Sequence, residues 1–343
     1  MSASSVQPSP AGASTDDPSA TAAGSADGAH RSGLSTWGVA GVLLLILLAV
    51  PPLSVIAGGK YLLVVGERIM IFAIAAMALD LLVGYGAMVS MGFAASLGVG
   101  AYAAGILASH GYTQAEIGLP AAMLASLAFS LATGAVAVRT KGAYFIMITL
   151  AFAQMAFFVA TSLAPYGGDD GLTLQARSTI FGAPYLRNEA IFYYVILACL
   201  AATFLLLRML IASRFGRVLQ GLTQNSERMR AIGFNAFPYL LTAYGIAGAL
   251  GGLAGFLLLN QAEFVAPAYM SWQRSGELLV MVLLGGVGTL QGAMLGAVAF
   301  LVTEEILAGL TEHWKAIFGP LITLIALYAR GGLMRIVRLG AQP

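Results

Sequence analysis

Long apolar runs separated by short polar or glycine-rich segments follow one another from about residue 37 to residue 329. A helix needs roughly 20 mainly apolar residues to cross the hydrocarbon core of a bilayer. The pattern therefore predicts an all-α polytopic membrane protein with about ten transmembrane helices. The predicted spans are Trp37–Ala57, Glu67–Val83, Met91–Ser109, Leu119–Val138, Ala143–Ser162, Ile191–Ile211, Tyr239–Asn260, Gly276–Leu284, Gln291–Leu310 and Ile317–Ala329. The eighth is short and is a candidate re-entrant segment, which would make the count about nine.

The two ends of the chain differ from this apolar middle. Residues Met1–His30 are rich in Ser, Ala, Gly and Pro and contain no apolar run, which is typical of disorder. A signal peptide has its apolar core directly after a short basic start, whereas here a long polar stretch comes first. We expect a disordered cytoplasmic tail at 1–35, a transmembrane domain at 36–333 and a cytoplasmic tail at 334–343.

The composition supports a membrane protein and excludes several other classes. Hydrophobic residues make up 59% of the 343 residues and charged residues 9%, and the mean hydropathy is +0.86. Ordinary soluble domains contain about 25% charged residues, so lipid is the expected surrounding. A net charge of +2 gives no basis for nucleic-acid binding.

The Lys and Arg residues are distributed unevenly across the predicted membrane domain. With the amino terminus inside, the inner set is Arg31, Arg139, Lys141, Arg208, Arg214, Arg217, Arg228, Arg230, Arg330, Arg335 and Arg338. The outer set is Lys60, Arg68, Arg177, Arg187, Arg274 and Lys315, and the two sets account for all 17. Because inner loops carry the excess of Lys and Arg, this asymmetry predicts that both termini are cytoplasmic.

One predicted cytoplasmic loop, 213–238, is strongly basic. Its first part, SRFGRVLQGLTQNSERMRAIG at Ser213–Gly233, is charge-rich and lies between two long apolar spans. Its length and its lack of Pro permit an amphipathic helix on the cytoplasmic face. One interpretation is a loop that only sets the topology, and the other is a docking element for a soluble partner.

Two glycine-rich breaks interrupt the apolar pattern, GYGAMVSMG at Gly84–Gly92 and GGVGTLQG at Gly285–Gly292. Similar phrases, SLGVGAY and MLGAVAF, follow them and give a weak indication of an internal duplication. Irregular backbone within a bilayer must be packed in protein or face water, so each break is either a tight turn or part of a solute route. We expect such a route to be mostly apolar with few fixed charges. Its candidate residues are Asp80, Gly84, Gly86, Ser90, Gly92, Gly285, Gly286 and Gly288.

Few acidic residues fall within the predicted spans. A carboxylate at a helix centre is costly in lipid, so Asp80 should face protein or water. It either lines a route or is a packing group held by backbone N–H groups at the glycine break, and the second interpretation is favoured. Glu277, Glu304 and Glu305 lie near predicted span ends, from which they can reach interfacial water.

Several kinds of chemistry are missing from the sequence. It contains no G-x-x-x-x-G-K-[ST] phosphate loop, no His/Cys cluster with metal spacing and no series of Asp, Glu and His within the spans. We therefore expect a chain that is not an enzyme and that binds no cofactor. If it moves a solute against a gradient, another subunit must supply the energy.

Six motifs occur in a recognisable order. They are Ala78–Tyr102, Arg139–Met155, GGDDGL at Gly167–Leu172, the basic loop, the segment from Pro267 to GGVGTLQG, and ARGGL at Ala329–Leu333. In this order they resemble the LivM-type permease family of branched-chain amino-acid ABC transporters, from about Ile69 to Leu333. Asp80, Ala87 and Phe93 depart from the family pattern, which has Asn, Gly and His there.

The resemblance implies the pore-forming permease subunit of a binding-protein-dependent importer in the bacterial inner membrane. Its partners would be a second, LivH-type permease, two cytoplasmic ATPase subunits that use ATP, and an external solute-binding protein. The basic loop would couple transport to the ATPases through Phe215, Gly216, Arg217, Asn225, Glu227, Arg228, Arg230 and Gly233.

Other functions remain open at this point. Permeases for urea or short-chain amides are similar, and these motifs do not separate them from amino-acid permeases. A secondary transporter or channel would need no ATPase. The sparse charge in the spans argues against proton or sodium coupling but not against a channel.

Overall fold

The apolar runs between Lys60 and Leu310 form helices. The long ones are α3 (Lys60–Gly86), α4 (Phe93–Ser109), α5 (Ala115–Ala137), α6 (Ala143–Ser162), α7 (Glu189–Ala212), α10 (Ala236–Ala262), α11 (Trp272–Gly285) and α12 (Leu290–Leu310). Each coincides with a predicted span. The largest difference is at α3, which begins at Lys60 and not at Glu67, because Glu67 is buried and does not end the helix.

The computed structural model describes residues 41–49, 51–52, 60–174, 176–180, 182–310, 316, 318–320 and 333–334. All the elements named here belong to one unit, Val42–Pro343. The predicted tail 1–35 lies outside the described residues, as do 334–343 apart from Met334 and the tenth predicted span apart from residues 318–320. Of the first predicted span, residues 41–49 and 51–52 are described, and they are helical.

Length and composition identify the helices that can cross a membrane. Within the described residues, α3 from Tyr61 onward and the whole of α5, α6, α7, α10 and α12 are long and apolar enough to do so. The apolar helix α4 is shorter, and α11 ends at the second glycine break after 14 residues. The described residues are therefore those of an all-helical, multi-pass membrane protein.

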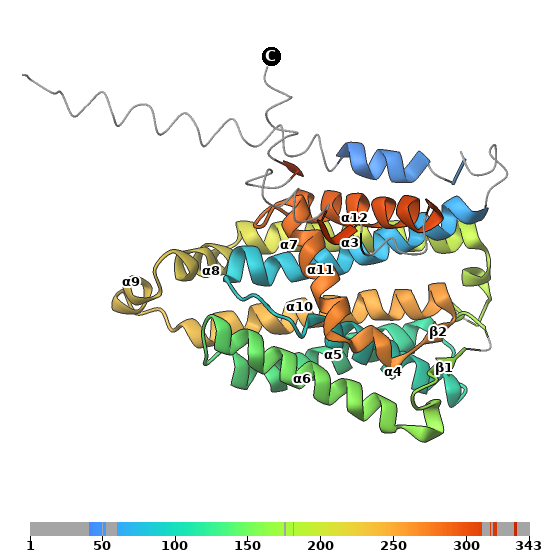
Figure 1. Ribbon diagram of the computed structural model, residues 1–343, viewed down its shortest axis with the longest axis horizontal. Helices are drawn as coiled ribbons and strands as arrows, with labels where there is room; N and C mark the ends of the chain where they lie inside the picture. The colour runs from blue at the N-terminus through green and yellow to red at the C-terminus, as the bar shows by residue number, and fades with distance from the viewer. Residues whose placement is uncertain are drawn as a thin grey trace, which may run out of the picture. The chain divides into compact units, whose positions relative to one another are not determined.

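The long helices form two layers. Figure 1 shows α3, α7 and α12 in one layer and α4, α5, α6 and α10 in the other, with α11 crossing between them. Helix α10 joins the layers, since it packs against α4 and α5 and also against α3. Small residues allow this approach: a Cβ added at Gly255 of α10 would lie 2.0 Å from the carbonyl oxygen of Leu97 in α4. Close packing through small residues is typical of helices in membranes.

Short elements close the ends of the bundle. Strands β1 (Leu172–Thr173) and β2 (Phe264–Val265) pair antiparallel, with Leu172 opposite Val265. Figure 1 places them at the opposite end of the view from α8 (Arg214–Gln224) and α9 (Ser226–Ala231). The 3-10 turns are η1 (Ala164–Tyr166), η2 (Tyr185–Arg187) and η3 (Pro267–Met270).

Candidate functional site

The two glycine breaks meet at a buried carboxylate. Asp80 of α3 is fully buried, and its Oδ1 accepts a hydrogen bond of 2.8 Å from the backbone N–H of Gly288. One turn further along α3, a Cβ added at Gly84 would lie 2.3 Å from the same nitrogen. The contact connects the end of α3 to the turn between α11 and α12. The described geometry thus gives Asp80 the backbone partner expected of a packing group, although the partner belongs to the second break and not the first.

The first break is longer than a tight turn. After α3 ends at Gly86, residues 87–92 are non-helical until α4 begins at Phe93. Ala87 has a φ of +50°, a left-handed backbone that favours glycine. The N–H of Met88 donates to the carbonyl of Leu82 at 2.9 Å, which turns the chain back on α3. At the far end of the break, a Cβ at Gly92 would lie 2.1 Å from the carbonyl oxygen of Thr149 in α6.

The second break is a short hairpin. Gly286 and Gly288 have φ values of +115° and +76°, a region that L side chains rarely adopt. A Cβ at Gly285 would lie 1.7 Å from the carbonyl oxygen of Gly292, so α11 and α12 touch through their backbones. Among the candidate route residues, the structure therefore brings Asp80 and Gly84 to this hairpin. Gly86, Ser90 and Gly92 lie within the first break, and the role of all of them as route lining stays a prediction.

The basic loop forms two short helices and not the single helix that its composition permitted. Ser213 caps α8, since its Oγ accepts from the N–H of Gly216 at 3.4 Å. Asn225 has an extended backbone that ends α8, and its Oδ1 accepts from the N–H of Arg228 at 2.9 Å, which caps α9. A Cβ at Gly216 would lie 2.2 Å from the carbonyl oxygen of Ile211, so only glycine fits the corner between α7 and α8.

The two helices enclose a groove at the start of α10. Helix α8 is amphipathic, with Leu219 and Leu222 buried and Arg217 exposed. The ring of Phe215 stacks on that of Tyr239 in α10 at a centroid distance of 5.7 Å. A cavity of about 620 Å³ is lined by Arg214, Phe215, Arg217, Val218, Met229, Phe234 and Tyr239. Of the other predicted coupling residues, Glu227, Arg228 and Arg230 are exposed on α9, and Gly233 forms the following turn with a φ of +93°.

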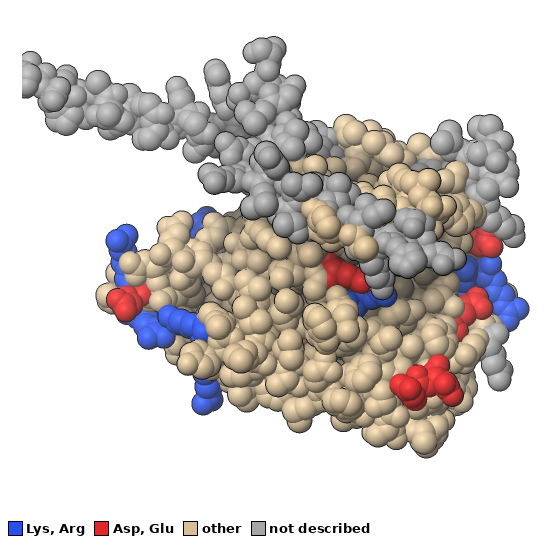
Figure 2. Space-filling view, viewed as in Figure 1, with Lys and Arg blue, Asp and Glu red and all other residues tan. Residues whose placement is uncertain are grey.

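The structure adds residues to this end that the sequence did not assign to the coupling site. The Nζ of Lys141 donates to the Oγ of Ser226 in α9 at 3.0 Å, and the guanidinium of Arg139 lies 5.6 Å from the ring centroid of Phe237. The connection between α5 and α6 thus contacts α9 and the start of α10, beside the platform made by α8 and α9. The only sequence signal that could have linked Arg139 and Lys141 to this site was the charge count, which placed both on the inner side. Figure 2 shows Lys and Arg side chains gathered at this end of the molecule.

The three glutamates expected to reach interfacial water each have a polar partner in the structure. Glu304 of α12 forms an ion pair with Arg68 of α3 at 3.3 Å, and Glu277 pairs with Arg274 within α11 at 2.5 Å. Glu305 accepts a hydrogen bond from the hydroxyl of Tyr61. Each glutamate thus has a partner in the structure, and the expectation that they reach interfacial water stays a prediction. No group of three or more His, Cys, Asp or Glu that could hold a metal ion occurs among the described residues.

The bundle, its glycine hairpin and its basic groove define a multi-pass membrane protein of the permease class. Residues 61–327 match the family described as branched-chain amino acid transport system / permease component, and the chain belongs to this family. It is 25% identical over 292 residues to the high-affinity branched-chain amino acid transport system permease protein LivM of Salmonella typhimurium, covering 78% of this chain and 69% of that protein. The corresponding LivM of Escherichia coli is 24% identical to this chain, again over 292 residues that make up 78% of this chain and 69% of that protein.

Two further relatives cover less of the chain. The high-affinity branched-chain amino acid transport system permease protein LivH of Salmonella typhimurium is 23% identical over 167 residues, which is 48% of this chain and 53% of that protein. The fructose import permease protein FrcC of Rhizobium meliloti is 24% identical over 154 residues, 43% of each chain. No solved structure matches the chain.

Proposed function

We propose that this chain is the membrane-spanning permease subunit of a binding-protein-dependent ABC importer that translocates branched-chain amino acids. The observation that carries the proposal is the family match over residues 61–327, together with the names of the LivM relatives. The chain does not hydrolyse ATP in this proposal and binds no cofactor, because separate ATPase subunits supply the energy. The absence of a phosphate loop from the sequence supports this division of labour.

The proposed complex contains four kinds of subunit. This chain pairs with a second, LivH-type permease in the bacterial inner membrane, two ATPases bind on the cytoplasmic side, and a solute-binding protein delivers the amino acid from outside. The chain crosses the bilayer about ten times with both termini in the cytoplasm, or about nine times if α11 is re-entrant, in which case the two termini lie on opposite sides.

The groove formed by α8, α9 and the start of α10 is the docking site for an ATPase subunit. Its lining combines two arginines with three aromatic rings, so it suits a short helix that presents both acidic and apolar side chains. The caps at Ser213 and Asn225 fix the two helices that form its walls. The contact between Lys141 and Ser226 ties the groove to α5 and α6, so a movement of the ATPase can reach the bundle.

Uptake and co-purification test the whole proposal. Cells that lack this chain should lose ATP-dependent uptake of labelled leucine, and the tagged chain should retain two ATPases and a second permease when purified from membranes. Uptake of leucine at the normal rate without the chain would contradict the proposal. Urea uptake in the same cells tests the similar permeases for urea and short-chain amides.

Charge reversal tests the docking site. The double variant Arg217→Glu and Arg228→Glu should insert normally but lose ATPase co-purification, since both side chains are exposed at the groove end. The matched control is Arg187→Glu, which reverses an exposed arginine in η2 at the end of the bundle that carries β1 and β2. Normal ATPase binding and normal uptake in the double variant would exclude this docking site.

A further inference from the structure

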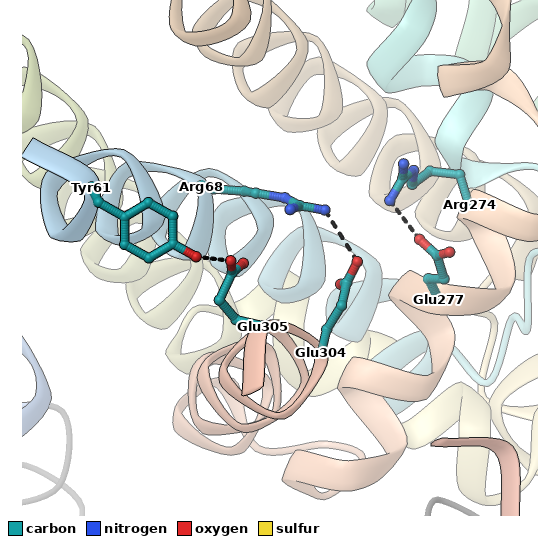
Figure 3. Close-up of polar contacts among 6 residues, drawn as sticks. All are labelled: Tyr61, Arg68, Arg274, Glu277, Glu304 and Glu305. Atoms are coloured by element: carbon teal, nitrogen blue, oxygen red, sulfur yellow. Dashed lines mark hydrogen bonds and ion pairs between the residues drawn. The ribbon is translucent and has the colours of Figure 1, made fainter. Parts of the chain in front are cut away.

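Helices α3, α11 and α12 bring a cluster of polar and charged side chains together. Figure 3 shows its members, Tyr61, Arg68, Arg274, Glu277, Glu304 and Glu305. One ion pair joins α3 to α12 and the other lies within the first turns of α11. Residues far apart in the sequence thus form a mixed-charge site that lies outside both glycine breaks and outside the basic groove.

A buried aromatic ring shows how far along α3 this cluster extends. Phe72 lies near the middle of α3 (Lys60–Gly86) and is buried. The guanidinium carbons of Arg68 and Arg274 lie 6.0 Å and 5.5 Å from its ring centroid. The cluster therefore reaches the middle of a helix that is long enough to cross a membrane. Ionised groups at that depth face protein or water and not lipid.

Open space lies beside the pair on α11. The side chains of Arg274 and Glu277 are 24% and 31% exposed. A Cβ added at Gly276, between them in sequence, would meet nothing within 4 Å. Figure 2 also shows acidic and basic side chains in the middle of the view, apart from the charged groups at the two ends. The pair is thus accessible to a small solute and is not sealed by the helices described around it.

We propose that Arg274 and Glu277 bind the two charged groups of an amino-acid solute during its passage, and this proposal rests on the proposed function. Arg274 binds the α-carboxylate and Glu277 the α-ammonium. A zwitterion replaces both partners of the ion pair at once, so neither charge loses its counter-charge. Urea or a neutral amide cannot do this, and a solute with one charge leaves one side chain unpaired. The route then includes a fixed ion pair, in contrast to the mostly apolar route that the sequence predicts.

Exchanging the two charges tests the proposal. Arg274→Glu with Glu277→Arg keeps an ion pair three residues apart on α11 but reverses its direction. Leucine uptake per assembled complex should fall roughly ten- to a hundredfold, as expected for lost charge-assisted hydrogen bonds. The matched control exchanges an ion pair outside the cluster, Arg177→Glu with Glu263→Arg, and should keep uptake near the wild-type rate. Wild-type uptake by the α11 exchange would overturn the proposal.

Thiol protection tests the same site without disturbing the pair. Gly276→Cys in a Cys199→Ala background places a thiol beside the pair where a side chain has room. In membranes that contain the complete complex, leucine should slow labelling of this thiol. Isoamylamine and 4-methylvalerate, which each carry one of the two charges, and urea should not. Labelling that leucine does not slow, or that urea slows equally, would overturn the proposal.

The two proposals fail in different ways. Co-purification of the ATPases and ATP-dependent leucine uptake by the unaltered complex report on the proposed function alone. If both are normal while leucine gives no protection at position 276, only the role of the α11 pair is lost. If leucine uptake does not depend on the chain, the proposed function fails before the pair is tested.

Discussion

At the scale of single residues, one side chain holds the two glycine breaks together. The fully buried Asp80 accepts the hydrogen bond from the N–H of Gly288. Asp80→Ala should therefore destabilise the protein by about 1–3 kcal/mol, the cost of leaving a buried N–H unsatisfied. Asp80→Asn keeps an acceptor oxygen and should lose much less. Thermal unfolding of the two purified variants in detergent checks this, and equal loss in both would contradict the role of the hydrogen bond.

At Gly84, where α3 touches the second glycine break, a single added methyl group should lower the stability of the protein. Gly84→Ala places a Cβ against the backbone of Gly288, which cannot move aside as a flexible side chain can. We expect a loss of about 1–3 kcal/mol from overpacking. Gly86→Ala meets mainly the side chain of Met88 and should cost less.

The control for this series is Gly309→Ala in α12, where an added Cβ meets nothing within 4 Å. This change should be neutral or slightly stabilising, because alanine favours a helix more than glycine does. The yield of folded protein and the melting temperature order the three variants. A more stable Gly84→Ala than Gly309→Ala would exclude close packing at the junction.

At the scale of elements, the caps at Ser213 and Asn225 stabilise the two helices of the platform made by α8 and α9. Asn225→Ala removes the acceptor for the N–H of Arg228 and should cost about 1 kcal/mol of local helix stability. Helix α9 has only six residues, so this loss should loosen it and lower uptake per molecule of ATP hydrolysed. Asn225→Asp keeps the acceptor and places a negative charge at a helix start, so it should preserve coupling. Equal coupling in both variants would contradict this view of α9.

An element could be predicted from the sequence where neighbouring residues alone determine it, and was missed where it depends on the folded backbone. Helix α6 has the bounds that the apolar run predicts, since the run is itself the signal. The split of the basic loop at Asn225 was missed because a cap depends on backbone angles as well as on residue type. Strands β1 and β2 were missed because two-residue strands leave no periodic pattern, and Leu172 meets its partner Val265 only in the folded chain.

At the scale of the whole molecule, the sequence identified several candidate residues but did not reveal which residues they contact in the folded chain. Both Asp80 and Gly288 were candidates, but nothing local shows that two residues 208 positions apart share a hydrogen bond. The ion pair between Arg68 and Glu304 joins residues 236 positions apart, and the sequence placed them near separate span ends. Periodicity reports which residues face inward, whereas such partners depend on how the helices pack.

Topology is the property of the whole molecule on which the proposed function depends most directly. In the proposed importer the ATPases work in the cytoplasm, so we expect α8 and α9 on that side and the GGDDGL loop on the other. The structure separates them, since β1 begins at the last residue of GGDDGL and lies at the opposite end of the view in Figure 1 from α8 and α9. The basic residues gathered around α8 and α9 predict that this end lies inside.

Single cysteines in a Cys199→Ala background test this orientation. Asp170 and Gln224 are both exposed, and neither has a left-handed backbone that would strain a cysteine. In cells with a permeabilised outer envelope and an intact inner membrane, an impermeant thiol reagent should label Asp170→Cys and not Gln224→Cys. Disruption of the inner membrane should make both positions react, which shows that each thiol is accessible. Labelling of position 224 in intact inner membranes would place α8 and α9 outside, where no ATPase can dock, and would therefore contradict the coupling role of the basic groove as well as the topology.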